Sequence, residues 1–147
     1  IEIVHKNKKM IIIDPKKNSF ECFAGADIIT PNVKEFQMAT NLNSITEVEL
    51  VKNAKKMCNE LSIKEILITR SNKGMLLVNK NGFKRITAIE KKVADVTGAG
   101  DTVVSILALM KAIGFNSYTS SKIANLAASK IITKIGAETL SMSELFG

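Results

Sequence analysis

Residues 95–102 read Asp95-Val96-Thr97-Gly98-Ala99-Gly100-Asp101-Thr102, and they form the most informative stretch of the chain. Two glycines flank an alanine, and a long apolar helix is expected to begin at about Gly100. Small residues let backbone N–H groups approach an anion closely, and the start of a helix adds the positive end of its dipole. The sequence therefore predicts an anion-binding turn at residues 98–100.

Asp101 follows this turn and would lie inside the first turn of the helix. A carboxylate there would repel a bound phosphate, so its presence suggests a chemical task such as taking the proton of an attacking hydroxyl. The alternative is structural: the glycines form a loop and Asp101 caps the helix. The stretch is not a Walker A loop, because no GKS or GKT follows, and not GxGxxG, because Val103 occupies the position of the third glycine. Both interpretations stay open on these residues alone.

Strands and helices alternate along the rest of the chain. Short apolar runs indicate buried strands, and apolar residues spaced three and four apart indicate one face of a helix. This alternation predicts an α/β layered fold with a mostly parallel sheet, in which ligands bind at the carboxyl ends of strands. We expect strands at residues 10–13, 27–30, 65–69, 75–78 and 83–86, a hairpin turn at 79–82, and helices at 31–38, 46–61, 100–113 and 118–133.

Composition bounds the class of protein. With 147 residues, 46% of them hydrophobic and 24% charged, the chain has the balance of one globular domain. The net charge of +7 comes from scattered basic residues, and there is no Trp and only one Tyr, so we expect no nucleic-acid partner. No apolar segment is long enough for a signal peptide or a bilayer span, so we expect no membrane partner. A cytoplasmic protein follows, in which Cys22 and Cys58 are reduced thiols rather than a disulfide. The single histidine, His5, excludes a histidine metal cluster.

The glycine-rich stretch closely resembles the C-terminal signature DTxGAGD of the ribokinase (PfkB-like) family. This resemblance implies a ribokinase-like three-layer α/β fold, of which residues 1–147 would be a single partial domain, the C-terminal half. It implies that Asp101 is the catalytic base and that the amides of residues 98–100 (Gly98, Ala99 and Gly100) form the anion hole for the transferring phosphoryl group. It also implies that Asp95 and Thr97 help to hold a monovalent cation, K⁺.

Asn32-Val33-Lys34-Glu35 matches the NxxE motif of the same family. By the resemblance, Asn32 and Glu35 organise Mg²⁺ and the phosphates of ATP, partly through water. Taken alone, Asn32 as a helix N-cap with Glu35 as its capping-box partner is a complete structural explanation. Only the combination with the glycine-rich stretch favours the functional interpretation.

Two further segments match the nucleotide site of the family. Residues 69–74, Thr69-Arg70-Ser71-Asn72-Lys73-Gly74, follow a predicted strand, and by the resemblance Thr69, Ser71 and Gly74 face the ATP phosphates. Many relatives have glycine at the position of Ser71. Asn125 matches the helix that lines the adenine pocket, although a helix face of small residues also serves close packing.

The match is closer still to one subfamily. The stretches 13–16, 30–36, 69–75 and 95–103 look like the heptose-7-phosphate kinase domain of bifunctional ADP-heptose synthases. That resemblance implies ATP-dependent phosphorylation of C1 of D-glycero-D-manno-heptose 7-phosphate, a step toward the lipopolysaccharide inner core. Lys16 would then help to neutralise an anionic ligand, whereas the alternative is an ordinary surface lysine.

The chain opens at Ile1 without a Met, and residues 1–6 read like the end of a helix, so we expect a fragment. The resemblance implies that an N-terminal half with most sugar contacts and a fused nucleotidyltransferase domain are missing. We therefore expect an isolated chain that does not turn over and that self-associates as a homo-oligomer, because an incomplete sheet exposes an edge. The alternatives are another ribokinase-like substrate, such as a fructose phosphate, a nucleoside or a vitamin alcohol, and a non-catalytic nucleotide-binding module. Asp101, Asn32 and Glu35 weigh against the last of these.

Overall fold

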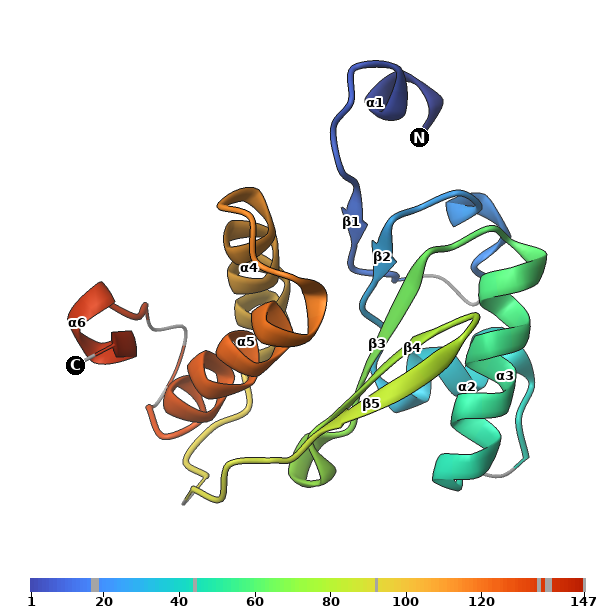
Figure 1. Cartoon of the computed structure of the whole chain (residues 1–147). Coiled ribbons are helices and arrows are strands. Elements are labelled where there is room, and N and C mark those ends of the chain that lie inside the picture. The colour runs from blue at the N-terminus through green and yellow to red at the C-terminus, as the bar shows by residue number, and fades with distance from the viewer. Residues whose placement is uncertain (17–18, 44, 92, 135, 137–138, 147) are drawn as a thin grey trace. The chain divides into compact units, whose positions relative to one another are not determined.

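The structure is a computed structural model that describes residues 1–147 except 17–18, 44, 92, 135, 137–138 and 147 (Figure 1). The chain forms two compact units. The first consists of residues 1–70 and 76–85, and the second of residues 71–75 and 86–147. None of the helices in the described part of the chain has the length and apolar character needed to cross a membrane.

The first unit holds most of a five-stranded sheet and three α-helices. The strands are β1 (Ile12–Ile13), β2 (Ile28–Ile29), β3 (Glu65–Thr69), β4 (Met75–Asn79) and β5 (Gly82–Ile86), and they neighbour one another in that order. The helices are α1 (Glu2–Lys6), α2 (Val33–Thr40) and α3 (Glu47–Glu60), with a 3₁₀ turn η1 (Glu21–Phe23). The expected strands and helices of this part are confirmed, although β1 and β2 are shorter than the apolar runs that predicted them.

The sheet changes direction half-way. Strands β1, β2 and β3 are parallel, with Ile12 opposite Ile28 and Ile29 opposite Ile66. Only residues 70–74 join β3 to β4, and only residues 80–81 join β4 to β5. Connections this short join antiparallel strands, because a parallel pair needs a crossover of a dozen or more residues. The predicted hairpin at 79–82 is thus confirmed, and the parallel part of the sheet comprises β1 to β3.

The core of the first unit lies between one face of the sheet and helices α2 and α3. Alternate residues of two strands, Ile66 and Ile68 of β3 with Leu76 and Val78 of β4, point to this face and are fully buried. The helices contribute Phe36 from α2 and Leu50, Val51, Ala54 and Cys58 from α3, at helical spacing. A parallel sheet buried in this way orients the polar loops at its carboxyl edge.

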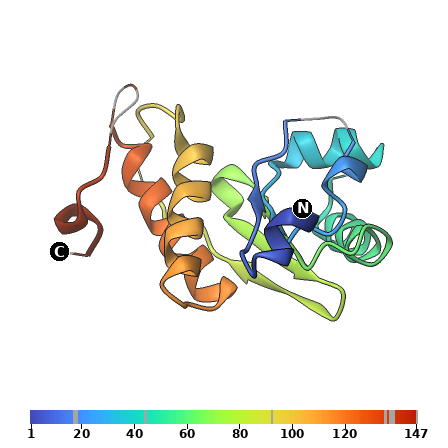
Figure 2. The same cartoon turned by 90° about the horizontal axis from the view of Figure 1, so that it is seen from above.

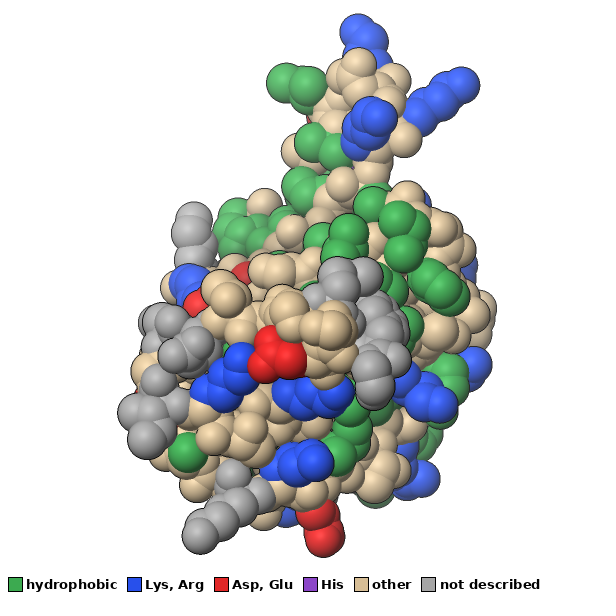
Figure 3. Space-filling view, turned by 90° about the vertical axis from the view of Figure 1, so that its left-hand side faces the viewer, with side chains coloured by type: hydrophobic (Ala, Val, Ile, Leu, Met, Phe, Trp, Pro, Cys, Tyr) green, Lys and Arg blue, Asp and Glu red, His purple; other side chains and the backbone are tan. Residues whose placement is uncertain are grey.

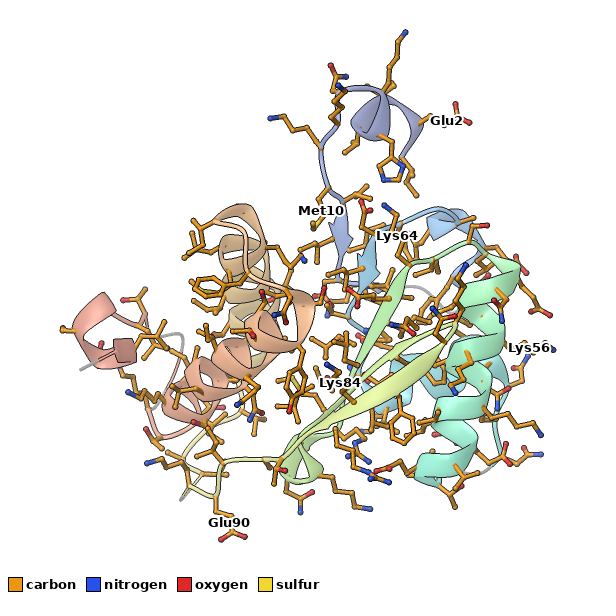
Figure 4. All side chains as sticks on the ribbon, viewed as in Figure 1. Glu2, Met10, Lys56, Lys64, Lys84 and Glu90 are labelled. Carbon is orange, nitrogen blue, oxygen red and sulfur yellow. The ribbon has the colours of Figure 1, made fainter. Side chains whose placement is uncertain are left out.

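Asp27 connects helix α1 to the sheet. The residue is 7% exposed. Its carboxylate accepts hydrogen bonds from His5 Nε2 at 2.9 Å and the Ile11 N–H at 2.8 Å, and it pairs with Lys64 Nζ at 2.6 Å (Lys64 is labelled in Figure 4). Burial alone would raise the pKa of Asp27, but the donors from Lys64, Ile11 and His5 more than offset it, and the pKa lies below its ordinary value. These contacts hold α1 against the first parallel strands.

The lysines around α1 are solvated. Lys6, Lys8 and Lys9 are exposed, and basic side chains extend outward from this segment in Figure 3. Exposed lysines of this kind are usually solvated.

The second unit contains helices α4 (Ala99–Ala112), α5 (Ser117–Ile131) and α6 (Met142–Phe146) and the 3₁₀ turn η2 (Ser71–Lys73). Helices α4 and α5 lie side by side in both views (Figures 1 and 2). Val103, Leu107 and Met110 form the buried stripe of α4. The buried face of α5 consists largely of alanine and serine, and such small side chains let two helix backbones approach closely. Both helices were expected from the sequence at nearly these bounds.

Candidate active site

The carboxyl edge of the parallel strands collects four of the predicted site residues. Lys16 follows β1, Asn32 and Glu35 follow β2, and Thr69 is the last residue of β3. The Thr69 N–H donates to the Pro31 carbonyl at 2.9 Å, and Asn32 and Thr69 form an isolated parallel bridge. The start of the NxxE segment and the start of the predicted nucleotide loop are therefore adjacent.

Asn32 and Glu35 form a complete capping box. The Asn32 N–H donates to Glu35 Oε2 at 2.8 Å, and the Glu35 N–H donates to Asn32 Oδ1 at 2.9 Å. The structural interpretation of these two residues is thus correct. It does not exclude the functional one, because the Asn32 amide N–H₂ and the second Glu35 oxygen are not used in the box.

Lys16 joins the loop after β1 to helix α2. Its ammonium lies 2.9 Å from Asp14 Oδ2 and 3.4 Å from Glu35 Oε1, while the side chain is 66% exposed. The hydrogen bond to Asp14 raises the pKa of Lys16, so the group is charged at neutral pH. One ammonium between two carboxylates leaves this cluster with a net negative charge, which suits a cation better than a free phosphate. Asp14 belongs to it and was not predicted as a site residue, although the Asp-Pro-Lys stretch contained the signal.

The glycine-rich turn lies at the start of α4 in the second unit. Gly98 is the N-cap of the helix with φ +77°, in the left-handed region where a side chain costs about 1–2 kcal/mol. No side chain caps the helix, and a Cβ added at Gly98 or Gly100 would meet no atom within 4 Å. The turn is therefore open at the positive end of a helix, and within it the Ala99 N–H donates to the Val96 carbonyl at 3.2 Å.

Asp101 lies in the first turn of α4. Its side chain is exposed, and it forms no hydrogen bond or ion pair with any residue that the structure describes. The alternative in which Asp101 caps helix α4 is wrong, because the cap position belongs to Gly98 and receives no side-chain bond. A carboxylate without a protein partner at a helix start matches the requirement for a base that meets a ligand hydroxyl.

Asp95 and Thr97 bind each other just before this turn. Asp95 Oδ1 accepts from the Thr97 N–H at 2.9 Å and from Thr97 Oγ1 at 2.7 Å, and Asp95 Oδ2 accepts from the Gly136 N–H at 3.2 Å. The Thr97 backbone and hydroxyl bonds lower the pKa of Asp95, which is therefore a carboxylate at neutral pH. The pair fixes the segment that leads into the glycine-rich turn.

The predicted nucleotide loop has two residues in the left-handed region. Ser71 has φ +52° and Gly74 has φ +73°. A Cβ at Gly74 would lie 2.0 Å from the Ile86 carbonyl oxygen and 2.6 Å from the Ala88 nitrogen, so only glycine fits there. The conformation of Ser71 agrees with the glycine that many ribokinase-like proteins have at this position.

Asn125 contacts the same segment as Gly74. Its side chain is buried on α5, and Nδ2 donates to the Thr87 carbonyl at 2.9 Å. This contact, which was not predicted, joins α5 to the chain that leaves β5. The Oδ1 atom of Asn125 is not used in this bond.

The predicted site residues thus fall into two groups. The first unit brings together Lys16, Asn32, Glu35 and Thr69. The second holds Ser71, Gly74, Asp95, Thr97, Gly98, Ala99, Gly100, Asp101 and Asn125. The loop that begins at Thr69 connects the two groups covalently. Within the described residues no three His, Cys, Asp or Glu side chains gather into a metal-binding cluster.

Comparison with known proteins identifies the family of this chain. The family model described as pfkB family carbohydrate kinase matches residues 1–144. The chain belongs to the pfkB family of carbohydrate kinases. This pfkB-family chain is 39% identical over 136 residues to the bifunctional protein HldE of Coxiella burnetii (strain Dugway 5J108-111), a match that covers 92% of this chain and 28% of that protein. The chain spans less than a third of the length of the curated relatives it matches, which are covered to 28–30%.

Two ribokinase structures share the fold of this pfkB-family chain. Ribokinase from Thermotoga maritima is 28% identical with a TM-score of 0.84, and the match covers 98% of this chain and 50% of that one. Ribokinase from Arabidopsis thaliana, solved in complex with ribose and ATP, is 26% identical with a TM-score of 0.83, over 92% of this chain and 45% of that one. The predicted ribokinase-like α/β fold is confirmed.

Proposed function

We propose that this chain supplies the ATP site and the catalytic base of a kinase that phosphorylates C1 of D-glycero-D-manno-heptose 7-phosphate. The observation that carries the proposal is the unpartnered carboxylate of Asp101 beside the open turn at the start of α4. The heptose substrate rests on the likeness to HldE and on the subfamily stretches in the sequence.

Asp101 acts as the general base. It takes the proton of the sugar hydroxyl while that oxygen bonds to the γ-phosphorus of ATP, and the bond from this phosphorus to the β-phosphate oxygen breaks to release ADP. The amides of residues 98–100 stabilise the charge on the transferring phosphoryl oxygens. The open space around Gly98 and Gly100 supports this role, because the phosphoryl group must approach the backbone itself.

The other residues bind and orient. Thr69, Ser71 and Gly74 contact the ATP phosphates, and Asn125 borders the adenine with the oxygen that its bond to Thr87 leaves unused. Asn32 and Glu35, in the net negative cluster with Asp14 and Lys16, fit a Mg²⁺ ion held partly through water. Mg²⁺ supplies neutralisation of phosphate charge when it is bound.

Two assignments are more specific. Asp95 and Thr97 offer oxygens to a K⁺ ion at the approach to the glycine-rich turn. Lys16 lies at the carboxyl edge of β1, where its ammonium would meet the phosphate of the sugar once a metal ion reduces the charge of Glu35 and Asp14. Both assignments concern ligands that approach from the loop side of the sheet.

Residues beyond this chain complete the proposed enzyme. A sheet edge at β1 and the share of the relatives that is matched support a preceding half that carries most sugar contacts, with a nucleotidyltransferase domain in the whole protein. We expect the isolated chain to self-associate through this edge and not to turn over.

Calorimetric titration with Mg²⁺-ATP tests the proposal, with the parent protein, Gly100→Val and Asp101→Asn compared in the complete natural protein. We expect the parent and Asp101→Asn to bind and Gly100→Val not to bind. A coupled assay for ADP release then compares heptose 7-phosphate with fructose 6-phosphate and a nucleoside. Turnover with fructose 6-phosphate or the nucleoside alone would replace the substrate, and ATP binding without any turnover would favour a non-catalytic module.

A further inference from the structure

A cluster of charged side chains forms around Arg70, the residue between Thr69 and Ser71. Glu47, the first residue of α3, has one guanidinium on each carboxylate oxygen. Arg70 Nη1 lies 2.8 Å from Glu47 Oε2, and Arg85 Nε donates to Glu47 Oε1. The three residues come from α3, the end of β3 and β5, all in the first unit.

The members of this cluster differ in exposure. The Arg70 side chain is 10% exposed, that of Glu47 26%, and that of Arg85 64%. Burial alone would raise the pKa of Glu47, but the hydrogen bonds from Arg85 and Arg70 lower it, so Glu47 is a carboxylate at neutral pH. An almost buried guanidinium on a charged carboxylate is a stronger contact than a surface pair, and removing one partner leaves a costly buried charge.

The contact between Arg70 and Glu47 lies directly before the nucleotide loop. Thr69 is the last residue of β3, fixed by its bond to Pro31, and Arg70 is the first residue outside the sheet. The next residue, Ser71, has φ +52°, a conformation that costs a non-glycine residue about 1–2 kcal/mol. A strained backbone persists only where its surroundings fix it. Gly74 packs closely against residues 86–88 at the far end of the loop, and Arg70, bonded to Glu47, directly precedes its near end.

We propose that Glu47 and Arg70 are positioning residues that hold the nucleotide loop, residues 71–74, in its binding conformation without touching the nucleotide. Arg70 is too buried to serve as a phosphate ligand while it is paired with Glu47, and Glu47 acts on the loop only through Arg70. Arg85 shares the carboxylate from the exposed strand β5, and its guanidinium also lies over the Phe83 ring, 5.3 Å from the ring centroid. The inference rests on the proposed function in one respect: the loop is taken to bind ATP.

The test uses four variants of the complete natural protein: Glu47→Gln, Arg70→Lys, their combination, and Arg85→Lys as the matched control. We expect Glu47→Gln and Arg70→Lys each to raise the KM for ATP about tenfold, with kcat changed less, because the loop must be ordered on binding. The combined variant should be within about twofold of the worse single variant, because both changes break one link. Arg85→Lys should leave the KM unchanged.

Amide hydrogen exchange of residues 71–74 provides a second measurement that does not depend on activity. We expect faster exchange in Glu47→Gln and Arg70→Lys than in the parent or in Arg85→Lys. Unchanged exchange and unchanged KM, with only a lower melting temperature, would overturn the inference in favour of a plain structural ion pair. An effect of Arg70→Lys on KM without one of Glu47→Gln would overturn it in favour of a direct ligand. If the parent neither binds nor uses ATP, the proposed function fails, while exchange still tests the hold on the loop.

Discussion

Carboxylates of the first unit and the Asp101 carboxylate, beside the glycine-rich turn, differ in their hydrogen-bond partners. Asp27 and Glu47 each accept from two or more donors, and each joins parts of the chain that are distant in sequence. Asp101 has no such partner among the described residues. Paired carboxylates fix the framework, whereas a carboxylate kept without partners retains the freedom to exchange a proton with a ligand.

Asp101→Asn tests whether Asp101 contributes to catalysis rather than to stability. We expect Asp101→Asn to lower kcat by about a thousandfold, because a general base contributes roughly 10²–10⁴-fold. The same change should leave the free energy of unfolding within about 0.5 kcal/mol of the parent, since Asp101 bonds to none of the residues that the structure describes. Single-turnover kinetics and urea denaturation measure the two quantities. A large loss of stability would show that Asp101 belongs to the framework after all.

Gly74→Ala removes the fixed end of the nucleotide loop. The added methyl group would meet the Ile86 carbonyl at 2.0 Å and would also force a side chain into φ +73°, so we expect a loss of about 2–4 kcal/mol in unfolding free energy. Gly100→Ala is the matched control, because its methyl group would meet open space. Without nucleotide, this control should be as stable as the parent or slightly more stable. Equal losses in both variants would contradict the packing at Gly74.

Asp27→Asn tests how much a carboxylate with several hydrogen-bond partners stabilises the fold. The pKa of Asp27 in the folded protein lies below its ordinary value of 3.8, so its stabilising contribution is present above about pH 4 and is lost as the pH falls through the folded pKa. We expect the variant to be less stable than the parent by about 1–3 kcal/mol at pH 7, and the difference to shrink below pH 4. Urea denaturation across this pH range measures it. Glu2→Gln, an exposed carboxylate on α1 (Figure 4), should change little at any pH.

Lys16→Gln should change the free energy of unfolding only slightly. The ammonium is mostly exposed, and surface ion pairs contribute roughly 0–1 kcal/mol, so we expect a loss below about 1 kcal/mol by urea denaturation. The effect of the same change on the two KM values tests whether Lys16 binds the sugar phosphate. A raised KM for the phosphorylated sugar with an unchanged KM for ATP would place Lys16 on the sugar phosphate, whereas no change in either constant would leave it an ordinary lysine of the framework.

Local spacing predicted much of this molecule. The capping box of Asn32 and Glu35 and helices α4 and α5 all depend on residues three or four apart. Such contacts form within one turn, so the sequence order alone specifies them.

Contacts across long stretches of chain could not be predicted in the same way. The bonds from Arg70 and Arg85 to Glu47, the bond from Asn125 to Thr87 and the approach of Gly74 to residues 86–88 join segments that only the folded chain brings together. The residue types gave no signal of these pairings. The left-handed backbone of Ser71 could not be predicted either, because a serine does not indicate this conformation.

The chain passes between its two units more than once. This limits where the genes of two related kinases can be joined to make a chimera. Residues 71–75 belong to the second unit, yet residues 76–85 return to the first. A single crossover between two related genes therefore cannot exchange either unit intact. A junction at residue 85 would set the resident Gly74 against a foreign segment at 86–88, where there is no room for even one methyl group. Chimeric kinases built at this junction should be selected for backbone geometry at residues 86–88 before they are selected for catalysis.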